Sequence, residues 1–344
     1  FKQKTAYEML RSLVGSEMCI RDRKKMLHPI QHQHNLMLIG SCFTENMGEK
    51  LQKHKFKVMD NPNGILFNPV SVAEAITAYV DNTIYTSSDL FQYNDAWHSW
   101  KHHSRFSATT TEASLQKINT ATAAAHAYLS NADHIMITLG SAWIYTLTEK
   151  APQAKHGSVA ANNHKAPADW FYRRLMAIEE VLSVLDNMIH RLFFFNPKLK
   201  IIFTISPVRH LREGVIENNR SKAVLIQAVH HLVDKFDRLY YFPAYELVID
   251  DLRDYRFYAE DLVHPNYQAT QYVWEKFLGA CMDDDTRNLI KEIAEINIAH
   301  NHRPFNATSA QHRKFMASYH EKTWQLQQKH PYLDFSEELQ YFAF

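Results

Sequence analysis

Short apolar segments alternate with longer amphipathic stretches along most of the chain, and this rhythm constrains the fold more than any other feature. Each apolar segment has the length of a buried strand. Parallel strands need long crossover connections, which are usually helices. The rhythm therefore predicts an α/β protein whose central parallel sheet has about five strands and is covered by helices on both faces. The predicted strands are residues 35–39, 56–59, 133–139, 199–205 and 239–242.

The spacing of apolar residues predicts the helices between these strands. Phe43, Met47 and Leu51 are spaced at i, i+4 and i+8, so they share one face of a helix that follows the first strand. Residues 84–110 mix aromatic and polar side chains without a period, which indicates an inserted cap outside the sheet, and residues 150–167 have the composition of a surface loop. Further helices are predicted at residues 69–79, 111–129, 169–191, 219–236, 266–278 and 284–298 and in the polar C-terminal residues.

Three parts are expected along the chain. Residues 7–23, YEMLRSLVGSEMCIRDR, resemble translated sequencing-adapter DNA, although an amphipathic helix is the alternative. We therefore expect residues 1–25 to be non-native or disordered and exclude them from reasoning about the fold. Residues 26–282 are expected to form the α/β domain, and residues 283–344 a helical C-terminal extension.

Charge and cysteine content exclude several classes of protein. With 38 basic and 37 acidic residues, the chain has no strong field to attract nucleic acid. No apolar run approaches the ~18 residues needed to span a bilayer. Cys19, Cys42 and Cys281 show neither a disulfide framework nor zinc-finger spacing, which is typical of a protein in a reducing compartment. We therefore expect a cytoplasmic protein, while the oligomeric state stays open.

The first strand ends at a turn that could carry a nucleophile. Ligand sites of open parallel sheets lie beyond the carboxyl ends of the strands. Gly40, Ser41 and Cys42 occupy such an end and lead directly into the following helix. The N–H groups and positive dipole end of a helix N-terminus favour an ionised nucleophile and an oxyanion. The alternative is a turn of small residues selected only for tight packing.

An Asp-x-x-His pair occurs near the end of the α/β region. In Asp261-Leu-Val-His264, the carboxylate can meet the imidazole within one turn and fix its tautomer. The other ring nitrogen can then accept a proton from a nucleophile. Chance pairs of this kind are common in a chain that contains 21 histidines, so the spacing alone is weak support.

Other polar residues follow the remaining strands. Asn63-Gly64 and Gly140-Ser141 could supply N–H donors to an oxyanion, although plain turns would have the same composition. Ser206 and Arg209 follow the strand at residues 199–205. Arg209 could hold a carboxylate or phosphate of the substrate, or pair with a nearby aspartate.

The inserted cap contains a dense polar and aromatic cluster. Trp100, His102 and His103 could line a substrate site, or they could be the satisfied side chains of a surface loop. A zinc site built on His98, His102 and His103 would need a helix that the pattern does not support. We therefore predict neither a metal nor a cofactor.

Several motifs in a fixed order resemble the GSCFA-domain family, a bacterial group in the SGNH-hydrolase superfamily. They are LIGSCFTENMGEKL (38–51), NPNGILFNP (61–69), WHSWKHHSRFS (97–107), ITLGSAWIY (137–145), TISPVRHLREG (204–214), ENNRSKA (217–223) and YFPAYELVIDDLRDYRFYAEDLVHPN (241–266). The resemblance covers roughly residues 35–280. It implies a three-layer flavodoxin-like fold, with His264 as the base, Asp261 as its orienting carboxylate and Gly64 as an oxyanion donor.

Two departures from the superfamily pattern bear on the chemistry. The usual first block is Gly-Asp-Ser, so the register places Cys42 at the nucleophile position, with Ser41 as the alternative. Gly140-Ser141-Ala142 lacks the Asn of the usual Gly-x-Asn block, so Ser141, a backbone N–H, or an asparagine such as Asn63 or Asn68 would have to replace it.

The sequence supports two functions. The first is an esterase or acyltransferase that works through an acyl-enzyme. Its substrates would be ester-linked acyl groups, which could be carried by a glycan. The alternative is a non-catalytic module of the same fold that binds a glycan or an acylated ligand. A hydrogen bond from Cys42 Sγ or Ser41 Oγ to the His264 ring would favour the enzyme, and its absence would favour the binding module.

Overall fold

The computed structural model describes residues 25–153 and 155–343, so the N-terminal segment predicted to be non-native lies almost entirely outside the described residues. Its centre is one five-stranded sheet in the order β2-β1-β5-β8-β9, and every neighbouring pair is parallel. All five predicted strands are confirmed. Their bounds are β1 (Asn35–Gly40), β2 (Lys57–Asp60), β5 (His134–Leu139), β8 (Lys200–Ile205) and β9 (Leu239–Phe242).

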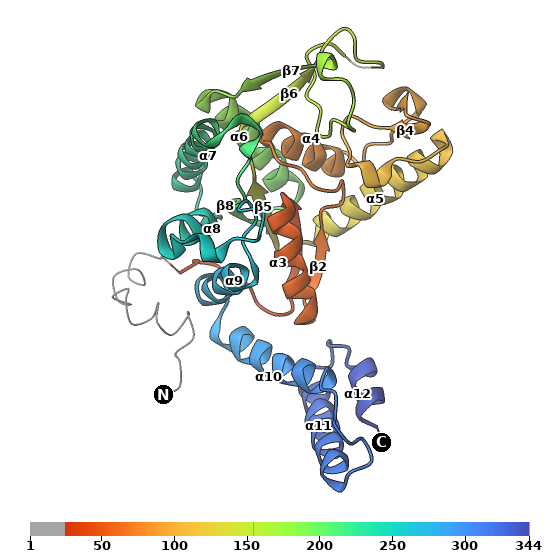
Figure 1. Ribbon diagram of the computed structural model, residues 1–344, viewed down its shortest axis with the longest axis vertical. Coiled ribbons are helices and arrows are strands. Elements are labelled where there is room, and N and C mark those ends of the chain that lie inside the picture. The colour runs from red at the N-terminus through yellow and green to blue at the C-terminus, as the bar shows by residue number, and fades with distance from the viewer. Residues whose placement is uncertain (1–24, 154, 344) are drawn as a thin grey trace.

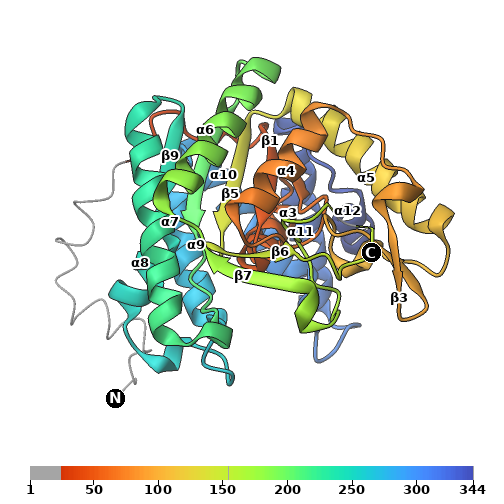
Figure 2. The same cartoon turned by 90° about the horizontal axis from the view of Figure 1, so that it is seen from above.

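Helices cover both faces of this sheet, which confirms the three-layer arrangement (Figure 1, Figure 2). Alternate residues of the strands enter different cores: Ile135 and Ile137 pack into one core, and Met136 packs into the other. The first core contains residues of α4 (Pro69–Val80), α5 (Thr111–Asn131), α6 (Ile178–Phe195) and α7 (Val215–Lys235). The second contains residues of α3 (Cys42–Lys53) and α9 (Tyr267–Cys281).

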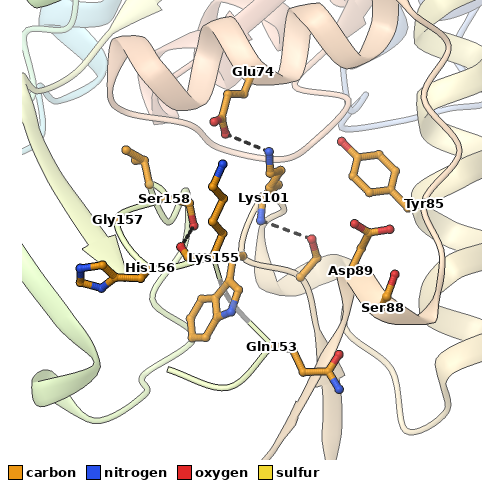
Figure 3. A pocket seen from close by; sticks show the side chains of 13 residues that line it. Glu74, Tyr85, Ser88, Asp89, Lys101, Gln153, Lys155, His156, Gly157 and Ser158 are labelled. Atoms are coloured by element: carbon orange, nitrogen blue, oxygen red, sulfur yellow. Dashed lines mark hydrogen bonds and ion pairs between the residues drawn. The ribbon is translucent and has the colours of Figure 1, made fainter. Parts of the chain in front are cut away.

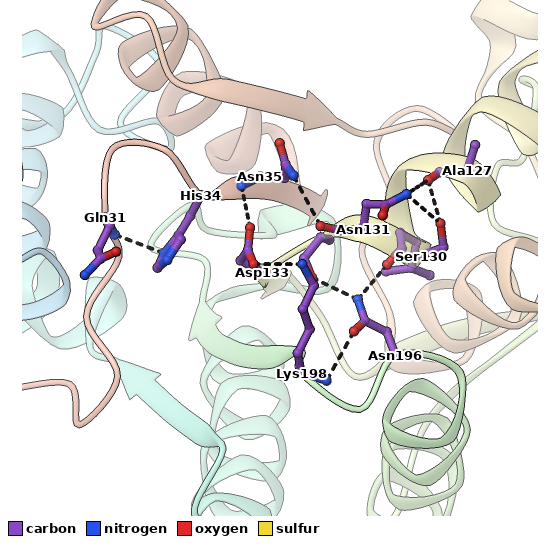
Figure 4. Close-up of polar contacts among 11 residues, drawn as sticks. Gln31, His34, Asn35, Ala127, Ser130, Asn131, Asp133, Asn196 and Lys198 are labelled. Carbon is purple, nitrogen blue, oxygen red and sulfur yellow. Dashed lines mark hydrogen bonds and ion pairs between the residues drawn. The ribbon is translucent and has the colours of Figure 1, made fainter. Parts of the chain in front are cut away.

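The amino ends of the central strands are held by a polar network. Asp133, which immediately precedes β5, accepts the Asn35 backbone N–H at 2.9 Å and lies 3.0 Å from Lys198 Nζ. Asn196 donates to the carbonyls of Leu129 and Ala132 (Figure 4). The polar side chains at this end of the sheet therefore bond to one another and to the backbone. The carboxyl ends of the strands are the place to look for a functional site.

The predicted cap lies outside the central sheet. It contains an antiparallel hairpin of β3 (Phe91–Tyr93) and β4 (Ala96–His98), flanked by the short 3-10 turns Ser87–Asp89 and Ser104–Phe106. Leu90 and Phe106 pack against Ile118 of α5, so the cap has a small core of its own.

The sequence prediction of one helix over residues 169–191 is wrong at its start. Phe171–Leu175 forms strand β7, which pairs antiparallel with β6 (Trp143–Leu147), and α6 begins only at Ile178. Glu180 accepts the Ala177 N–H at 2.8 Å and forms a bidentate pair with Arg174, which fixes the start of the helix. Pairing with β6 therefore overrides the local helical pattern.

Irregular structure connects β9 to α9. It comprises α8 (Ala244–Glu246), a π-helical turn at Leu247–Leu252 and a 3-10 turn at Tyr255–Phe257. Two further 3-10 turns occur at Ala168–Trp170 and Leu211–Glu213. Asp254 pairs with Arg256 at 2.7 Å, so an ion pair lies within this stretch.

Three helices follow the α/β region: α10 (Asp284–His300), α11 (Ala310–Lys329) and α12 (Ser336–Phe342). They share a separate apolar core and extend away from the sheet (Figure 1). Across the described ranges, no helix is both long and apolar enough to cross a membrane.

Candidate functional site

The turn after β1 is shaped by a glycine that no other residue could replace without strain. Gly40 has φ +141°, and a Cβ there would lie 2.1 Å from the Thr138 carbonyl oxygen. Its N–H donates to Asn61 Oδ1 at 2.8 Å, and the Ser41 N–H donates to Thr138 O at 3.2 Å. The turn is thus fixed between β2 and β5, and Cys42 begins α3 at the carboxyl edge of the sheet.

The two predicted nucleophiles have different surroundings. Ser41 is only 1% exposed, and its hydroxyl has no hydrogen-bond partner among the described residues. Cys42 is partly exposed. A substrate can therefore approach the Cys42 sulfur more readily than the Ser41 hydroxyl.

Burial and local charges act in opposite directions on Cys42. Burial raises the pKa of its thiol, while the N–H groups of Phe43 and of Cys42 itself lower it. The Glu45 carboxylate raises this pKa further and Lys222 lowers it, and the net direction is upward. The predicted preference of the helix N-terminus for a thiolate is therefore present but outweighed, so the thiol needs a base or a counter-charge.

Asp261 and His264 form the expected pair. The ring Nδ1 lies 2.6 Å from Asp261 Oδ2, and Oδ1 accepts the N–H groups of Val263 and His264 at 2.9 and 3.0 Å. These hydrogen bonds, led by the His264 backbone N–H, lower the pKa of Asp261 to about 2. The His264 side chain is 51% exposed, so the other ring nitrogen can meet a substrate.

The loop that carries this pair is attached to the carboxyl end of the sheet. The Arg209 N–H, in the loop after β8, donates to the Val263 carbonyl at 3.4 Å. However, no hydrogen bond among the described residues joins the His264 ring to Cys42 Sγ or Ser41 Oγ. Ser41, Cys42 and His264 therefore lie at the same edge of the sheet. They lack the hydrogen bond between nucleophile and histidine that a preassembled triad would show.

The His210 ring is partly buried beside Gly140 and Phe67. Burial, together with the charges of Lys222 and His264, lowers the pKa of His210 to about 4. Its ring packs edge-on against Phe67, with centroids 5.0 Å apart. His210 is therefore neutral near pH 7 and contributes shape rather than charge to the site.

The predicted oxyanion donors all have partners within the chain. The Gly64 N–H donates to Asn61 O at 2.7 Å, and the N–H groups of Gly140 and Ser141 donate to Phe67 O at 2.8 and 3.0 Å. Asn63 accepts from the Tyr79 hydroxyl at 2.8 Å and donates to the Lys101 carbonyl at 3.4 Å. The expectation that these donors face an oxyanion is thus not met in this conformation.

Neither asparagine considered as a replacement donor is free, because Asn68 caps α4 through the Ser71 N–H. The sequence prediction overlooked Asn61, the first residue after β2. Its Oδ1 accepts the Gly40 N–H, while its side-chain NH₂ is buried and has no hydrogen-bond partner in the described part of the chain. Its position directly after a strand end was the signal that could have identified it.

Two of the three predicted cap residues are held by contacts within the protein. Trp100 stacks on Phe91 with centroids 3.7 Å apart, and its indole N–H donates to Pro152 O at 3.2 Å. His102 is fully buried beside Ser99, and burial lowers its pKa to about 3. Trp100 also borders a polar cavity of about 660 Å³ between the cap, Gln153 and residues 155–159, where Lys101 pairs with Glu74 (Figure 3).

His103 is the predicted cap residue that reaches the site. A Cβ on Gly64, whose φ is +80°, would lie 2.2 Å from the His103 Cβ. The cap therefore closes directly onto the loop after β2, and only a glycine permits this approach.

Ser206 and Arg209 have different surroundings from those predicted. Ser206 is buried, and its hydroxyl accepts the Val208 N–H at 3.3 Å. The Arg209 guanidinium lies over the rings of Tyr258 and Tyr255, at 4.6 and 5.6 Å from their centroids. It borders a cavity of about 350 Å³ beside the His264 loop. Arg209 thus remains a candidate for holding a carboxylate or phosphate of the substrate, whereas the Ser206 hydroxyl is buried away from solvent.

The sequence prediction also missed a polar face of α7. Lys222 is 1% exposed, and its Nζ donates to Gly140 O at 2.6 Å and Ser206 O at 2.7 Å. Ser221 Oγ accepts the Ala142 N–H at 2.7 Å, and Asn218 Oδ1 accepts the His210 N–H at 3.0 Å. The signal was the i, i+3, i+4 spacing of these polar residues on a helix expected to be buried.

Burial lowers the pKa of Lys222 to about 7, while the nearby Cys42 acts in the opposite direction. Groups of three or more histidine, cysteine, aspartate or glutamate side chains able to hold a metal ion do not occur within the described residues.

Comparison with known proteins gives two family matches. The model described as GSCFA family matches residues 35–277, and that described as GSCFA domain protein, C-terminal domain, matches residues 293–343. No protein with a curated description matches the chain. A solved structure from Streptococcus pneumonia, provisionally described as a platelet activating factor, is 14% identical over 72% of this chain and 83% of its own, with a TM-score of 0.38.

Proposed function

The chain belongs to the GSCFA family, and on that premise we propose that it is an SGNH-type enzyme that cleaves or transfers ester-linked acyl groups through a covalent acyl-enzyme. The observation that carries this proposal is the 2.6 Å bond between Asp261 and the His264 ring, at the sheet edge that also presents Cys42. A carboxylate that fixes one ring nitrogen leaves the other available for proton transfer. A site that only binds a ligand does not need a histidine of fixed tautomer.

The proposed reaction assigns a role to each group. Cys42 Sγ attacks the ester carbonyl, and the thiol proton passes to His264 Nε2, because Nδ1 is held by Asp261. When the tetrahedral intermediate collapses, the leaving alcohol takes the proton from His264. Water or an acceptor alcohol then attacks the thioester carbonyl while His264 accepts its proton. The bond between the carbonyl carbon and Cys42 Sγ breaks, and the sulfur takes this proton from His264 as the acid or the new ester leaves. Each proton removed is returned, so the enzyme is regenerated without a cofactor.

The developing oxyanion needs donors that are not already engaged. The first N–H groups of a helix have no partner within the helix, and those of Cys42 and Phe43 lie next to the sulfur. We assign the oxyanion to this start of α3. Gly64, Gly140 and Ser141 could contribute only if they released their present carbonyl partners.

The test is acyl transfer from p-nitrophenyl acetate, followed by mass spectrometry of the acid-quenched protein. We expect acetylation of Cys42 in the wild type and in Ser41→Ala, and none in Cys42→Ala. His264→Ala should slow acetylation by about 100-fold or more, since a general base commonly contributes that much. His231→Ala, an exposed histidine on α7, is the matched control and should react like the wild type. Acetylation that persists unchanged in Cys42→Ala and His264→Ala would contradict the proposal.

Two observations favour a second function, a non-catalytic module that binds a glycan or an acylated ligand. Among the described residues the His264 ring forms no hydrogen bond with either candidate nucleophile, and the predicted oxyanion donors are engaged. Calorimetry with an O-acetylated oligosaccharide, combined with measurement of released acetate, separates the two functions. Saturable binding without acetate release and without acylated Cys42 would support the binding module.

A further inference from the structure

Two arginines without an acidic partner line the cavity of about 350 Å³ beside the His264 loop. In the part of the chain that the structure describes, the guanidinium groups of Arg209 and Arg253 form neither an ion pair nor a hydrogen bond. Their N–H groups are therefore available to a ligand. A guanidinium presents these groups as a rigid fork that matches the oxygens of a carboxylate or a phosphate.

Aromatic rings, rather than a carboxylate, hold the Arg209 guanidinium in place. It lies over the rings of Tyr258 and Tyr255, at 4.6 and 5.6 Å from their centroids, and both rings also line the cavity. Burial raises the pKa of the Tyr258 phenol, although Arg209 lowers it in part, so this ring is neutral near pH 7. The contact attracts the cation without neutralising its charge.

The acidic residues of the cavity do not cancel both arginines. Asp254 is already paired with Arg256 at 2.7 Å, and it also accepts the Arg256 backbone N–H at 2.9 Å. The other acidic residue of the lining is Asp250, which is exposed. Two guanidinium groups therefore face one carboxylate that has no ion-pair partner, and this surplus of positive charge favours an anionic ligand.

The walls of the cavity are joined to the loop that carries His264. The Arg209 N–H donates to the carbonyl of Val263, the residue before the histidine, at 3.4 Å. Tyr258 forms an antiparallel bridge with Pro265, the residue after it. A ligand held by Arg209 therefore lies beside the loop of the proposed catalytic base.

We propose that the ester substrate carries a carboxylate or phosphate group on its alcohol part, and that Arg209, together with Arg253, binds this group in the cavity. The assignment to the alcohol part rests on the function proposed above, in which His264 protonates the leaving alcohol. The binding of an anion does not, because it requires only the cavity and its arginines. Arg209 is thus a specificity-determining residue.

The first test compares esters of similar shape and different charge. The wild type should hydrolyse 4-acetoxybenzoate with a higher kcat/KM than 4-acetoxybenzamide. Arg209→Met should lower kcat/KM about tenfold more for the benzoate than for the benzamide, because hydrogen bonds to charged groups are the strong ones. A disturbed fold would lower both values alike, so equal losses, or no loss, would overturn the proposal. 4-Acetoxyphenyl phosphate, measured beside them, identifies which anion the site prefers.

Arg212→Met is the matched control. Arg212 lies three residues further along the chain, and its guanidinium is also held over a ring, 5.4 Å from the centroid of Tyr145. It does not line the cavity. This variant should keep the wild-type preference for the benzoate.

A second measurement separates the anion site from the enzymatic function. Calorimetry at low ionic strength measures binding of inorganic phosphate and of benzoate to the full chain with Cys42→Ala, which cannot be acylated at this sulfur. Adding Arg209→Met should weaken binding of the preferred anion about tenfold, and adding Arg212→Met should not. Arg209-dependent binding in a protein that hydrolyses none of the esters would keep the anion site and overturn the enzyme. Ester hydrolysis through Cys42 with anion binding unaffected by Arg209→Met would do the reverse.

Discussion

Gly64 and His103 show how the absence of one side-chain atom sets the distance between the cap and the loop after β2. Gly64→Ala would add a Cβ at φ +80°, 2.2 Å from the His103 Cβ. We expect a loss of ~2–4 kcal/mol in unfolding free energy, from backbone strain and overpacking together. Gly157→Ala is the control, because Gly157 has φ +82° but nothing within 4 Å of the added atom, and it should cost only ~1–2 kcal/mol. Denaturant titration measures both, and equal losses would contradict the proposed contact.

Lys222 should make stability depend on pH in a predictable direction. Its folded-state pKa of about 7 lies below the ordinary value for lysine, so between these values the folded protein binds fewer protons than the unfolded chain. Stability therefore rises with pH from about pH 7 to 10, by up to ~1.4 kcal/mol per pH unit from this group. The free energy of unfolding of the wild type minus that of Lys222→Met should show this positive slope. A flat difference would mean that Lys222 titrates normally.

Residues with a fixed local spacing were predictable, and residues defined by the fold were not. The Asp261–His264 contact could be predicted because both partners lie within one turn of the chain. The contacts of Lys222 could not, since Gly140 and Ser206 are 82 and 16 residues away and meet only when β5 and β8 lie side by side. The partners of two predicted oxyanion donors were unpredictable for the same reason, because the Phe67 carbonyl that accepts the Gly140 and Ser141 N–H groups belongs to another loop.

At the scale of elements, α7 connects the core of the protein to its candidate site. Its polar residues Asn218, Ser221 and Lys222 bond to the loops that follow β5 and β8. The same helix packs Leu225, Val229 and Leu232 into the core. One helix therefore both buries apolar surface and fixes the loops that surround Cys42.

Removing one of these buried hydrogen bonds should lower the free energy of unfolding more than removing an exposed hydrogen bond elsewhere in the protein. Ser221→Ala leaves the buried Ala142 N–H without its acceptor at 2.7 Å, so we expect a loss of ~1–3 kcal/mol. Ser130→Ala, at the exposed end of α5, removes a bond to Ala127 O and should change stability by less than ~0.5 kcal/mol. Urea titration of the two variants measures the loss of unfolding free energy. A loss in Ser221→Ala as small as that in Ser130→Ala would show that water accepts the Ala142 N–H in the variant.

The success of sequence prediction for whole elements depended on how much of each element is buried. β5 is buried at all six positions, so its apolar run identified it directly. β7, in contrast, exposes Tyr172 and Arg173 and is stabilised mainly by pairing with β6. Its sequence carries no burial pattern, which is why the helical interpretation of residues 169–175 was wrong.

At the scale of the molecule, the candidate site and the C-terminal helices occupy opposite ends of the sheet. The site surrounds the carboxyl ends of β1, β5 and β8. Helix α10 instead contacts the amino end, where Thr286 accepts the His32 N–H and Asn297 donates to the Lys53 carbonyl, and α11 and α12 pack against α10 (Figure 1). We propose that residues 283–344 are a separately packed extension whose role is distinct from the chemistry at Cys42.

Lys55 offers a test of that separation, because it holds the extension through one side chain. Its Nζ lies 2.8 Å from Glu338, donates to Asp334 O at 2.6 Å and lies over the Phe335 ring. Glu338 is only 6% exposed, so Lys55→Ala leaves a nearly buried carboxylate without its partner and should cost ~3–5 kcal/mol of stability. Lys55→Met combined with Glu338→Leu removes both charges and should recover most of this loss, because apolar replacement of a buried pair is often neutral.

Lys55→Ala should destabilise the packing of helices α10–α12 and leave the surroundings of Cys42 unchanged. Limited proteolysis should cut α10–α12 faster, and thermal unfolding should begin earlier, while the pH profile of Cys42 alkylation by iodoacetamide stays that of the wild type. Lys57→Ala, an exposed lysine two residues along the chain, should alter neither measurement. A Cys42 profile that shifts with Lys55→Ala would show that the two ends of the sheet are coupled, and the extension would then have to be treated as part of the functional unit.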